Sequence, residues 1–125
     1  MKNQQIKMLI IDDEEMLGEI VKDYFEDLGI TVKQVVSGKE GIDELLENDY
    51  DVALVDLRLP DTSGTDLISR VSRERSHIKY FIFTGSLDFI LNDEMRSLGL
   101  SDESVIYKPV RDMSELYKRI MNSFR

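Results

Sequence analysis

Short apolar runs alternate with helix patterns along the whole of this 125-residue chain, and this alternation limits its possible folds more than any other feature. The apolar runs are continuous, which is typical of parallel strands buried on both faces of a sheet. We expect one α/β domain over residues 1–125, with a core from about 7 to 124 and helices on both faces of the sheet. The five expected strands lie at residues 6–11, 30–36, 52–55, 80–83 and 105–107.

Each expected strand is followed by a helix pattern in which apolar residues recur every three or four positions. The fourth of these patterns begins at Phe89 or Ile90 and continues through Met95 and Leu98. The first and fourth helices are expected to stop at Gly29 and Gly99, because glycine tolerates the left-handed conformation that often ends a helix. The apolar stripes of the other four are Leu17, Val21, Tyr24 and Leu28; Ile42, Leu45 and Leu46; Leu67, Ile68 and Val71; and Leu116, Ile120, Met121 and Phe124.

Polar side chains follow four of the five expected strands. Asp12 and Asp13 follow the first strand, Asp56 the third, Thr84 the fourth and Lys108 the fifth. The carboxyl ends of parallel strands share one edge, and ligands bind there near the switch in strand order. We therefore expect these side chains to meet. Separate explanations, such as a helix N-cap role for Asp13, require several coincidences at the same edge.

The carboxylates in this set predict a cation site. Two carboxylates about 4 Å apart repel by roughly 4 kcal/mol at an effective dielectric constant near 20, so a cation or a proton is needed. With no cysteine and one histidine in the chain, the available ligands are oxygens, which suit Mg²⁺. Thr84 and Lys108 add a hydroxyl and an ammonium that can hold a phosphoryl group. The set indicates phosphoryl transfer, in which an aspartate can be the nucleophile.

The composition argues against several other functions. Without cysteine there is no disulfide framework, iron–sulfur cluster or thiolate zinc site. The net charge of −9 opposes direct binding to nucleic acid. No apolar run approaches the ~20 residues that span a bilayer, and residues 1–5 lead into the first strand without a signal-peptide core. We therefore expect a cytoplasmic protein that binds neither nucleic acid nor membrane.

The motifs around these residues resemble the receiver domain of two-component response regulators, of the single-domain, chemotaxis-regulator-like kind. They are LIIDDEE at residues 9–15, YDVALVDLRLP at 50–60 with Gly64, FTG at 83–85 and YKP at 107–109. The resemblance extends from about Lys7 to Phe124 and implies a flavodoxin-like, doubly wound (βα)5 fold with strand order 2-1-3-4-5. Whether the chain is a stand-alone receiver or part of a longer protein is left open by its sequence.

The resemblance implies that Asp56 accepts a phosphoryl group from a sensor histidine kinase or a phosphotransfer protein. Mg²⁺ would be bound by Asp13, Asp56 and the backbone carbonyl of Arg58, with Asp12 acting through a metal-bound water. The chain would be a switch and not an enzyme, since its chemistry is limited to its own phosphorylation and dephosphorylation. The long cation of Arg58 beside the phosphoacceptor is expected to alter the rate of dephosphorylation.

The same resemblance assigns the remaining residues of the site. Thr84 and Lys108 would contact the phosphoryl group, Gly85 would leave room for phosphoryl donors, and Pro109 would follow a cis peptide bond. Movement of Thr84 and Lys108 would shift an output face made by the fourth helix, the fifth strand and the fifth helix. An unknown downstream protein would bind this face. The expected oligomeric state is a monomer or a weak homodimer.

The sequence departs from the family pattern in three places, at Arg58, at residues 98–104 and at Val105, and the last of these bears on the switch. The family usually has tyrosine or phenylalanine three residues before the lysine, where this chain has Val105. Tyr107, two residues later, is expected on the same strand face as Val105. The coupling of Thr84 to an aromatic side chain is therefore either weaker than usual or made through Tyr107.

Two other functions are consistent with the sequence. One is an adaptor that has the receiver fold but is never phosphorylated, which the change at Val105 favours slightly. The other is a Mg²⁺-dependent phosphohydrolase with an aspartyl nucleophile. Haloacid-dehalogenase-like enzymes of that kind have a second aspartate two residues after the nucleophile, and this chain has Arg58 there.

Overall fold

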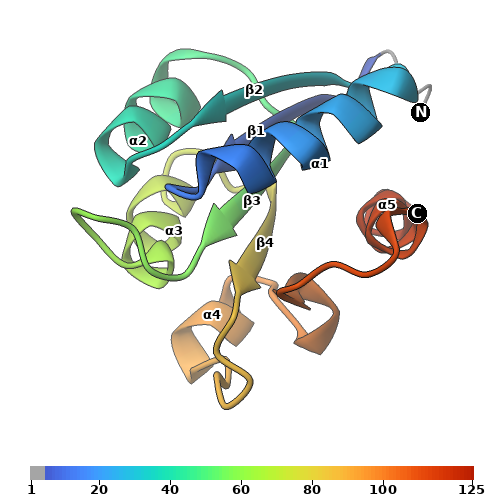
Figure 1. Cartoon of the computed structure of the whole chain (residues 1–125). Coiled ribbons are helices and arrows are strands. Elements are labelled where there is room, and N and C mark those ends of the chain that lie inside the picture. The colour runs from blue at the N-terminus through green and yellow to red at the C-terminus, as the bar shows by residue number, and fades with distance from the viewer. Residues whose placement is uncertain (1–4) are drawn as a thin grey trace.

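Five parallel strands form the central sheet of the computed structural model, which describes residues 5–125 (Figure 1). The strand order is β2-β1-β3-β4-β5, so the expected 2-1-3-4-5 order is confirmed. The expected N-terminal lead, residues 1–5, lies outside the described residues except for its last position. The strands are β1 (Lys7–Ile11), β2 (Thr31–Val35), β3 (Val52–Asp56), β4 (Lys79–Thr84) and β5 (Val105–Tyr107).

Helices cover both faces of the sheet, with α1 and α5 on one side and α2, α3 and α4 on the other (Figure 1). No helix within residues 5–125 is both long enough and apolar enough to cross a membrane. The helices are α1 (Glu15–Asp27), α2 (Gly38–Glu47), α3 (Gly64–Ser72), α4 (Asp93–Ser97) and α5 (Met113–Asn122), with a short 3₁₀ helix η2 (Asp102–Ser104) before β5.

One apolar core lies on each side of the sheet. Successive residues of a strand point to opposite faces, so Met8 and Ile10 join one core while Leu9 and Ile11 join the other. The four residues before Asp56 in β3 are fully buried. The end of this strand is therefore held in place by a buried backbone that is paired with β1 on one side and β4 on the other.

The fourth helix is shorter than the sequence pattern predicted. It begins at Asp93, because the side chain of Asn92 accepts a hydrogen bond from the Met95 amide at 2.8 Å and caps the helix there. The preceding segment, residues 85–92, is irregular, and Ile90 within it is 79% exposed. The expected helix start at Phe89 or Ile90 is wrong. The apolar spacing there does not form a helix, and the Asn92 cap sets the start instead. The expected stops at Gly29 and Gly99 are consistent with their positive φ angles of 90° and 100°.

Candidate functional site

Three carboxylates meet at the carboxyl edge of the sheet, as the strand ends predicted. Asp12 and Asp13 lie in the turn after β1, and Asp56 is the last residue of the neighbouring strand β3. One carboxylate oxygen from each lies within 4.8 Å of the others. We call these three residues the acidic cluster. Their spacing allows a single small cation to contact all three.

Asp56 is strongly affected by its surroundings. The residue is only 7% exposed, and its Oδ1 accepts a hydrogen bond from the Arg58 amide at 3.2 Å. Burial, followed by the negative charge of Asp12, raises the pKa of Asp56 to about 7, although Lys108 and the Arg58 amide act in the opposite direction. A second positive charge at this position would therefore favour the ionised, nucleophilic form of Asp56.

Lys108 supplies the positive charge within the site. Its Nζ lies 3.0 Å from Asp12 Oδ2, 2.9 Å from Glu14 Oε1 and 3.5 Å from Asp56 Oδ2. The ammonium also lies 4.8 Å from the centre of the Phe83 ring. Burial opposes the charged form, but the three carboxylates outweigh it and raise the pKa of Lys108. Lys108 is thus held charged and ready to donate hydrogen bonds.

The donor set fits Mg²⁺. Asp12 is buried; its Oδ1 accepts the Glu14 amide at 2.8 Å. Its Oδ2 is also buried and accepts no hydrogen bond from any described residue, so its contact with Lys108 is an ion pair only. A buried carboxylate oxygen without hydrogen bonds, in a cluster of oxygen donors with excess negative charge, favours a hard divalent cation. Asp13 is exposed and does not cap α1, which begins after Glu14.

The loop after β3 is packed closely onto the site. Gly64 donates its amide hydrogen bond to the Leu57 carbonyl at 2.7 Å, and a Cβ at Gly64 would collide with the carbonyl oxygen of Asp56. The side chain of Asp61 in this loop accepts two hydrogen bonds from the first amides of α2, at 2.8 and 2.9 Å. Both ends of the loop are therefore fixed, and with them the backbone of Arg58.

Thr84 and Tyr107 are neighbours at the carboxyl ends of β4 and β5. They are paired in the register of β4 and β5, so their side chains leave the same face. Thr84 is buried, and its Oγ1 accepts a hydrogen bond from the Ser86 amide at 3.0 Å. Tyr107 is 40% exposed and donates its hydroxyl hydrogen bond to the Phe89 carbonyl at 3.3 Å. Val105, by contrast, is buried.

A cleft opens above the acidic cluster. The Lys108–Pro109 peptide bond at its rim is cis, as the resemblance implied. A Cβ built on Gly85 would meet nothing within 4 Å, so this side of the cleft is open. The lining residues are Asp13, Glu14, Leu17, Asp56, Arg58, Thr84, Gly85, Ser86, Lys108 and Pro109.

A family model described as response regulator receiver domain matches residues 8–121. The chain belongs to this family. The response regulator SaeR of Staphylococcus aureus (strain USA300) is 33% identical over 115 residues, which cover 92% of this chain and 49% of SaeR. The chain thus spans about half the length of the curated relatives it matches.

Solved structures share the fold of this receiver domain. A CheY-like receiver domain protein from Methanospirillum hungatei JF-1 is 26% identical, with a TM-score of 0.82 and coverage of 94% of this chain and 92% of that one. TrrA from Thermotoga maritima, solved in complex with Mg(2+)-BeF, has a TM-score of 0.82 at 18% identity and coverage of 94% and 97%. These likenesses confirm the flavodoxin-like α/β fold expected from the sequence.

The receiver site contains one residue that the sequence pattern did not indicate. Glu14 has the features of an ordinary acid at a helix N-terminus, where negative charge is favourable. In the structure its carboxylate accepts a hydrogen bond from Lys108, which is 94 residues away in the chain. The meeting of strand ends predicts that Lys108 lies near Asp12, but it does not single out Glu14, which lies at the start of α1.

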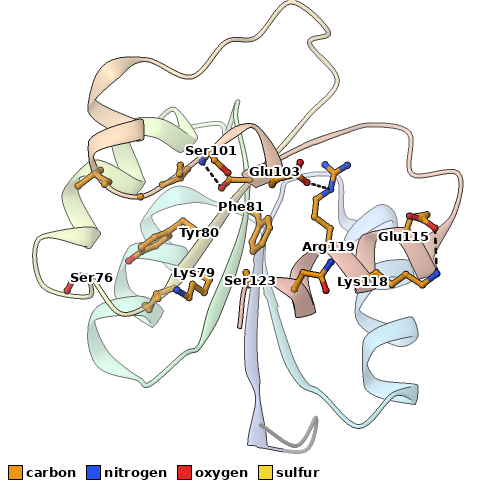
Figure 2. Close-up of a pocket in the computed structure, with 16 residues that line it drawn as sticks. Ser76, Lys79, Tyr80, Phe81, Ser101, Glu103, Glu115, Lys118, Arg119 and Ser123 are labelled. Carbon is orange, nitrogen blue, oxygen red and sulfur yellow. Dashed lines mark hydrogen bonds and ion pairs between the residues drawn. The ribbon is translucent and has the colours of Figure 1, made fainter. Parts of the chain in front are cut away.

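A second groove lies at the opposite end of β4 from Thr84 (Figure 2). It is bordered by the start of β4, the residues before β5 and one side of α5. Two ion pairs line it, Arg119 with Glu103 at 3.9 Å and Lys118 with Glu115 at 3.7 Å (Figure 2). Because ligands of such sheets bind beyond the carboxyl ends of the strands, we take the cleft above the acidic cluster as the functional site.

Proposed function

We propose that this receiver domain is a phosphorylation-activated switch, with Asp56 as the phosphoacceptor. A carboxylate oxygen of Asp56 attacks the phosphorus of a phosphohistidine on a sensor histidine kinase or a phosphotransfer protein. The new P–O bond makes an acyl phosphate as the P–N bond breaks, and the imidazole leaves with the electron pair and takes up a proton. The products are the phosphorylated receiver and the partner with its histidine restored.

The observation that supports this proposal most strongly is the surroundings of Asp56. The carboxylate is nearly buried at a strand end, beside another carboxylate and within 3.5 Å of an ammonium. Phosphoryl transfer depends mainly on positioning and on neutralising charge, which such a rigid, charged site provides. Burying charged groups costs free energy, and a role in phosphoryl transfer accounts for their burial at this strand end.

We propose that Mg²⁺ is held by Asp13, Asp56 and the backbone carbonyl of Arg58, with Asp12 acting through a bound water. When bound, the ion would neutralise charge on the phosphoryl oxygens. The loop fixed by Gly64 and Asp61 supports this assignment, because it holds the Arg58 backbone beside Asp56. The chain's own part is to orient these oxygens and to keep Asp56 ionised.

The switch would be read through Thr84 and Lys108. A phosphoryl group adds about −1.5 to −2 of charge and three acceptor oxygens, so both side chains would be drawn towards it. Movement of Thr84 would be felt by Tyr107, its partner in the strand register, which holds the Phe89 carbonyl. We propose that Tyr107 takes the part of the aromatic residue that is missing at Val105. The altered α4–β5–α5 face would then bind a downstream protein.

Intact-protein mass after incubation with acetyl phosphate and Mg²⁺ tests this proposal. We expect the wild-type protein to gain one phosphoryl group, and the gain to disappear with EDTA or in Asp56→Asn. Asp23→Asn, which removes an exposed carboxylate on α1, is the matched control and should behave like wild type. If neither acetyl phosphate nor a histidine kinase phosphorylates the wild-type protein, the unphosphorylated adaptor becomes the better explanation.

The kinase, the downstream protein, the cytoplasmic location and the monomeric or weakly dimeric state stay predictions. They concern the protein in its cell, and its curated relatives are about twice as long as this chain. The phosphohydrolase alternative has no support in the site, because Arg58 stands where such an enzyme has its second aspartate.

A further inference from the structure

The ammonium of Lys108 is surrounded by carboxylates: it donates a hydrogen bond to Glu14 and forms ion pairs with Asp12 and Asp56. An ammonium has three N–H donors, and Nζ faces Asp12 at 3.0 Å, Glu14 at 2.9 Å and Asp56 at 3.5 Å. The Lys108 side chain is only 10% exposed, so it has little room to find another partner. A phosphoryl oxygen that approaches Lys108 must therefore compete with these carboxylates, and Glu14 is the one that accepts a hydrogen bond from the ammonium.

Glu14 is the carboxylate best able to move. The side chains of Asp12 and Asp56 are 1% and 10% exposed, whereas that of Glu14 is 60% exposed. Glu14 also lies outside the acidic cluster, so the binding of a cation there would not hold it in place. Its carboxylate can turn into solvent without leaving a buried group unpaired.

The start of α1 shows that the Glu14 side chain is used for this contact and not for the helix. The other four α-helices are capped by side chains that accept a hydrogen bond from an amide of the first turn, those of Ser37, Ser63, Asn92 and Asp112. Glu14 occupies the same N-cap position in α1 but makes no capping hydrogen bond. Its carboxylate goes to Lys108 instead.

We propose that Glu14 is a positioning residue that restrains Lys108 in the unphosphorylated receiver and releases it when a phosphoryl group arrives. The inference rests on the proposed function, because it assumes that Lys108 contacts the phosphoryl group. In the resting state Glu14 occupies one donor of Lys108 and places a negative charge at the rim of the cleft. Both effects weaken the binding of an anionic phosphoryl group, so loss of Glu14 strengthens it.

Binding of beryllium fluoride in saturating Mg²⁺ tests this inference without any turnover. We would titrate BeF₃⁻, which imitates a phosphoryl group on an aspartate, into wild type, Glu14→Gln and Glu15→Gln, and follow the amide NMR spectrum. An exposed ion pair is worth little, so we expect Glu14→Gln to bind about 2- to 5-fold more tightly than wild type. Glu15→Gln removes the same charge from the next residue, which is exposed and has no ion pair within residues 5–125, and should bind like wild type.

A second measurement reports on the contact itself in protein free of metal and fluoride. The ¹⁵N resonance of Lys108 Nζ should shift in Glu14→Gln and stay unchanged in Glu15→Gln. Urea unfolding of both variants should match wild type, which separates positioning from loss of fold. Equal BeF₃⁻ affinities for the two variants would overturn the role of Glu14 and leave the proposed function standing. Failure of the wild-type protein to bind BeF₃⁻ or accept a phosphoryl group would overturn both.

Discussion

Gly64 lies directly against the backbone of Asp56, so closely that a Cβ there would collide with the Asp56 carbonyl oxygen. Gly64→Ala must therefore push the loop away from the end of β3. We expect the free energy of unfolding to fall by roughly 1–3 kcal/mol, as for other overpacked positions. We also expect weaker Mg²⁺ binding, because the Arg58 carbonyl moves with the loop. Urea unfolding and a Mg²⁺ titration of the same variant measure the two effects.

Gly85→Ala is the matched control for this change. A Cβ at Gly85 meets nothing within 4 Å, and φ there does not lie in the left-handed region. The free energy of unfolding should change by no more than about 0.5 kcal/mol, as at other uncrowded surface positions. Equal losses in the two variants would show that crowding at Asp56 is not the cause.

The buried carboxylate of Asp56 predicts a pH dependence in metal-free protein. Its pKa is about 7 in the folded state, above the ordinary value of 3.8, so the folded state keeps this proton between about pH 4 and 7 while the unfolded state loses it. The contribution of Asp56 to the free energy of unfolding is therefore largest at low pH. It declines as the pH rises, by at most about 1.4 kcal/mol per pH unit. Above about pH 7 the decline should level off.

Asp56→Asn isolates that effect. The difference between the unfolding free energies of the variant and the wild type should grow from pH 4 to about pH 7 in EDTA. Saturating Mg²⁺ should reduce the difference, because the cation stabilises the ionised carboxylate. Chemical unfolding across this pH range is the measurement. A difference that does not change with pH would contradict the raised pKa of Asp56.

Arg58 lines the cleft beside the phosphoacceptor, and its long side chain can shield an acyl phosphate or contact it. We expect phosphorylated Arg58→Ala to lose its phosphoryl group several-fold faster than wild type, because water gains access to the phosphorus. Decay of the phosphorylated mass after removal of the donor gives the rate. Arg73→Ala, in the turn after α3, is the control, and equal rates for all three proteins would discard the idea.

The hydroxyl of Tyr107 joins β5 to the irregular segment at residues 85–92. Tyr107→Phe removes one hydrogen bond, so amides of that segment should exchange with solvent about 2- to 10-fold faster. Hydrogen exchange followed by mass spectrometry measures this in the unphosphorylated protein. Tyr24→Phe on α1 should leave the segment unchanged. If Tyr107→Phe does the same, the segment is held by packing and the Tyr107 hydroxyl does not anchor it.

The site could be largely predicted because its geometry follows from one rule. Parallel strands end at the same edge, so residues after β1, β3, β4 and β5 had to meet whatever the loops between them do. Asp12, Asp56, Thr84 and Lys108 were found in this way. The rule places strand ends and not helix starts, which is why the part of Glu14 could not be inferred.

The start of α4 was mispredicted for a different reason. Apolar spacing favoured a helix from Phe89 or Ile90, but Leu91 and Met95 reach the core whether or not the residues before them are helical. Asn92 followed by two acidic residues is a capping signal that fixes the start locally. Where periodicity and a cap disagree in so short a helix, the cap is the better guide.

Strand β5 is only three residues long, or about 10 Å. At one end the Lys108 amide donates to the Thr84 carbonyl, and at the other Arg119 of α5 donates to the Val105 carbonyl. Strand β5 thus connects the phosphoacceptor site directly to the surface helix α5. If a downstream protein binds this face as proposed, exchanging the surface residues of α5 would change which protein binds while the acidic cluster stayed as it is.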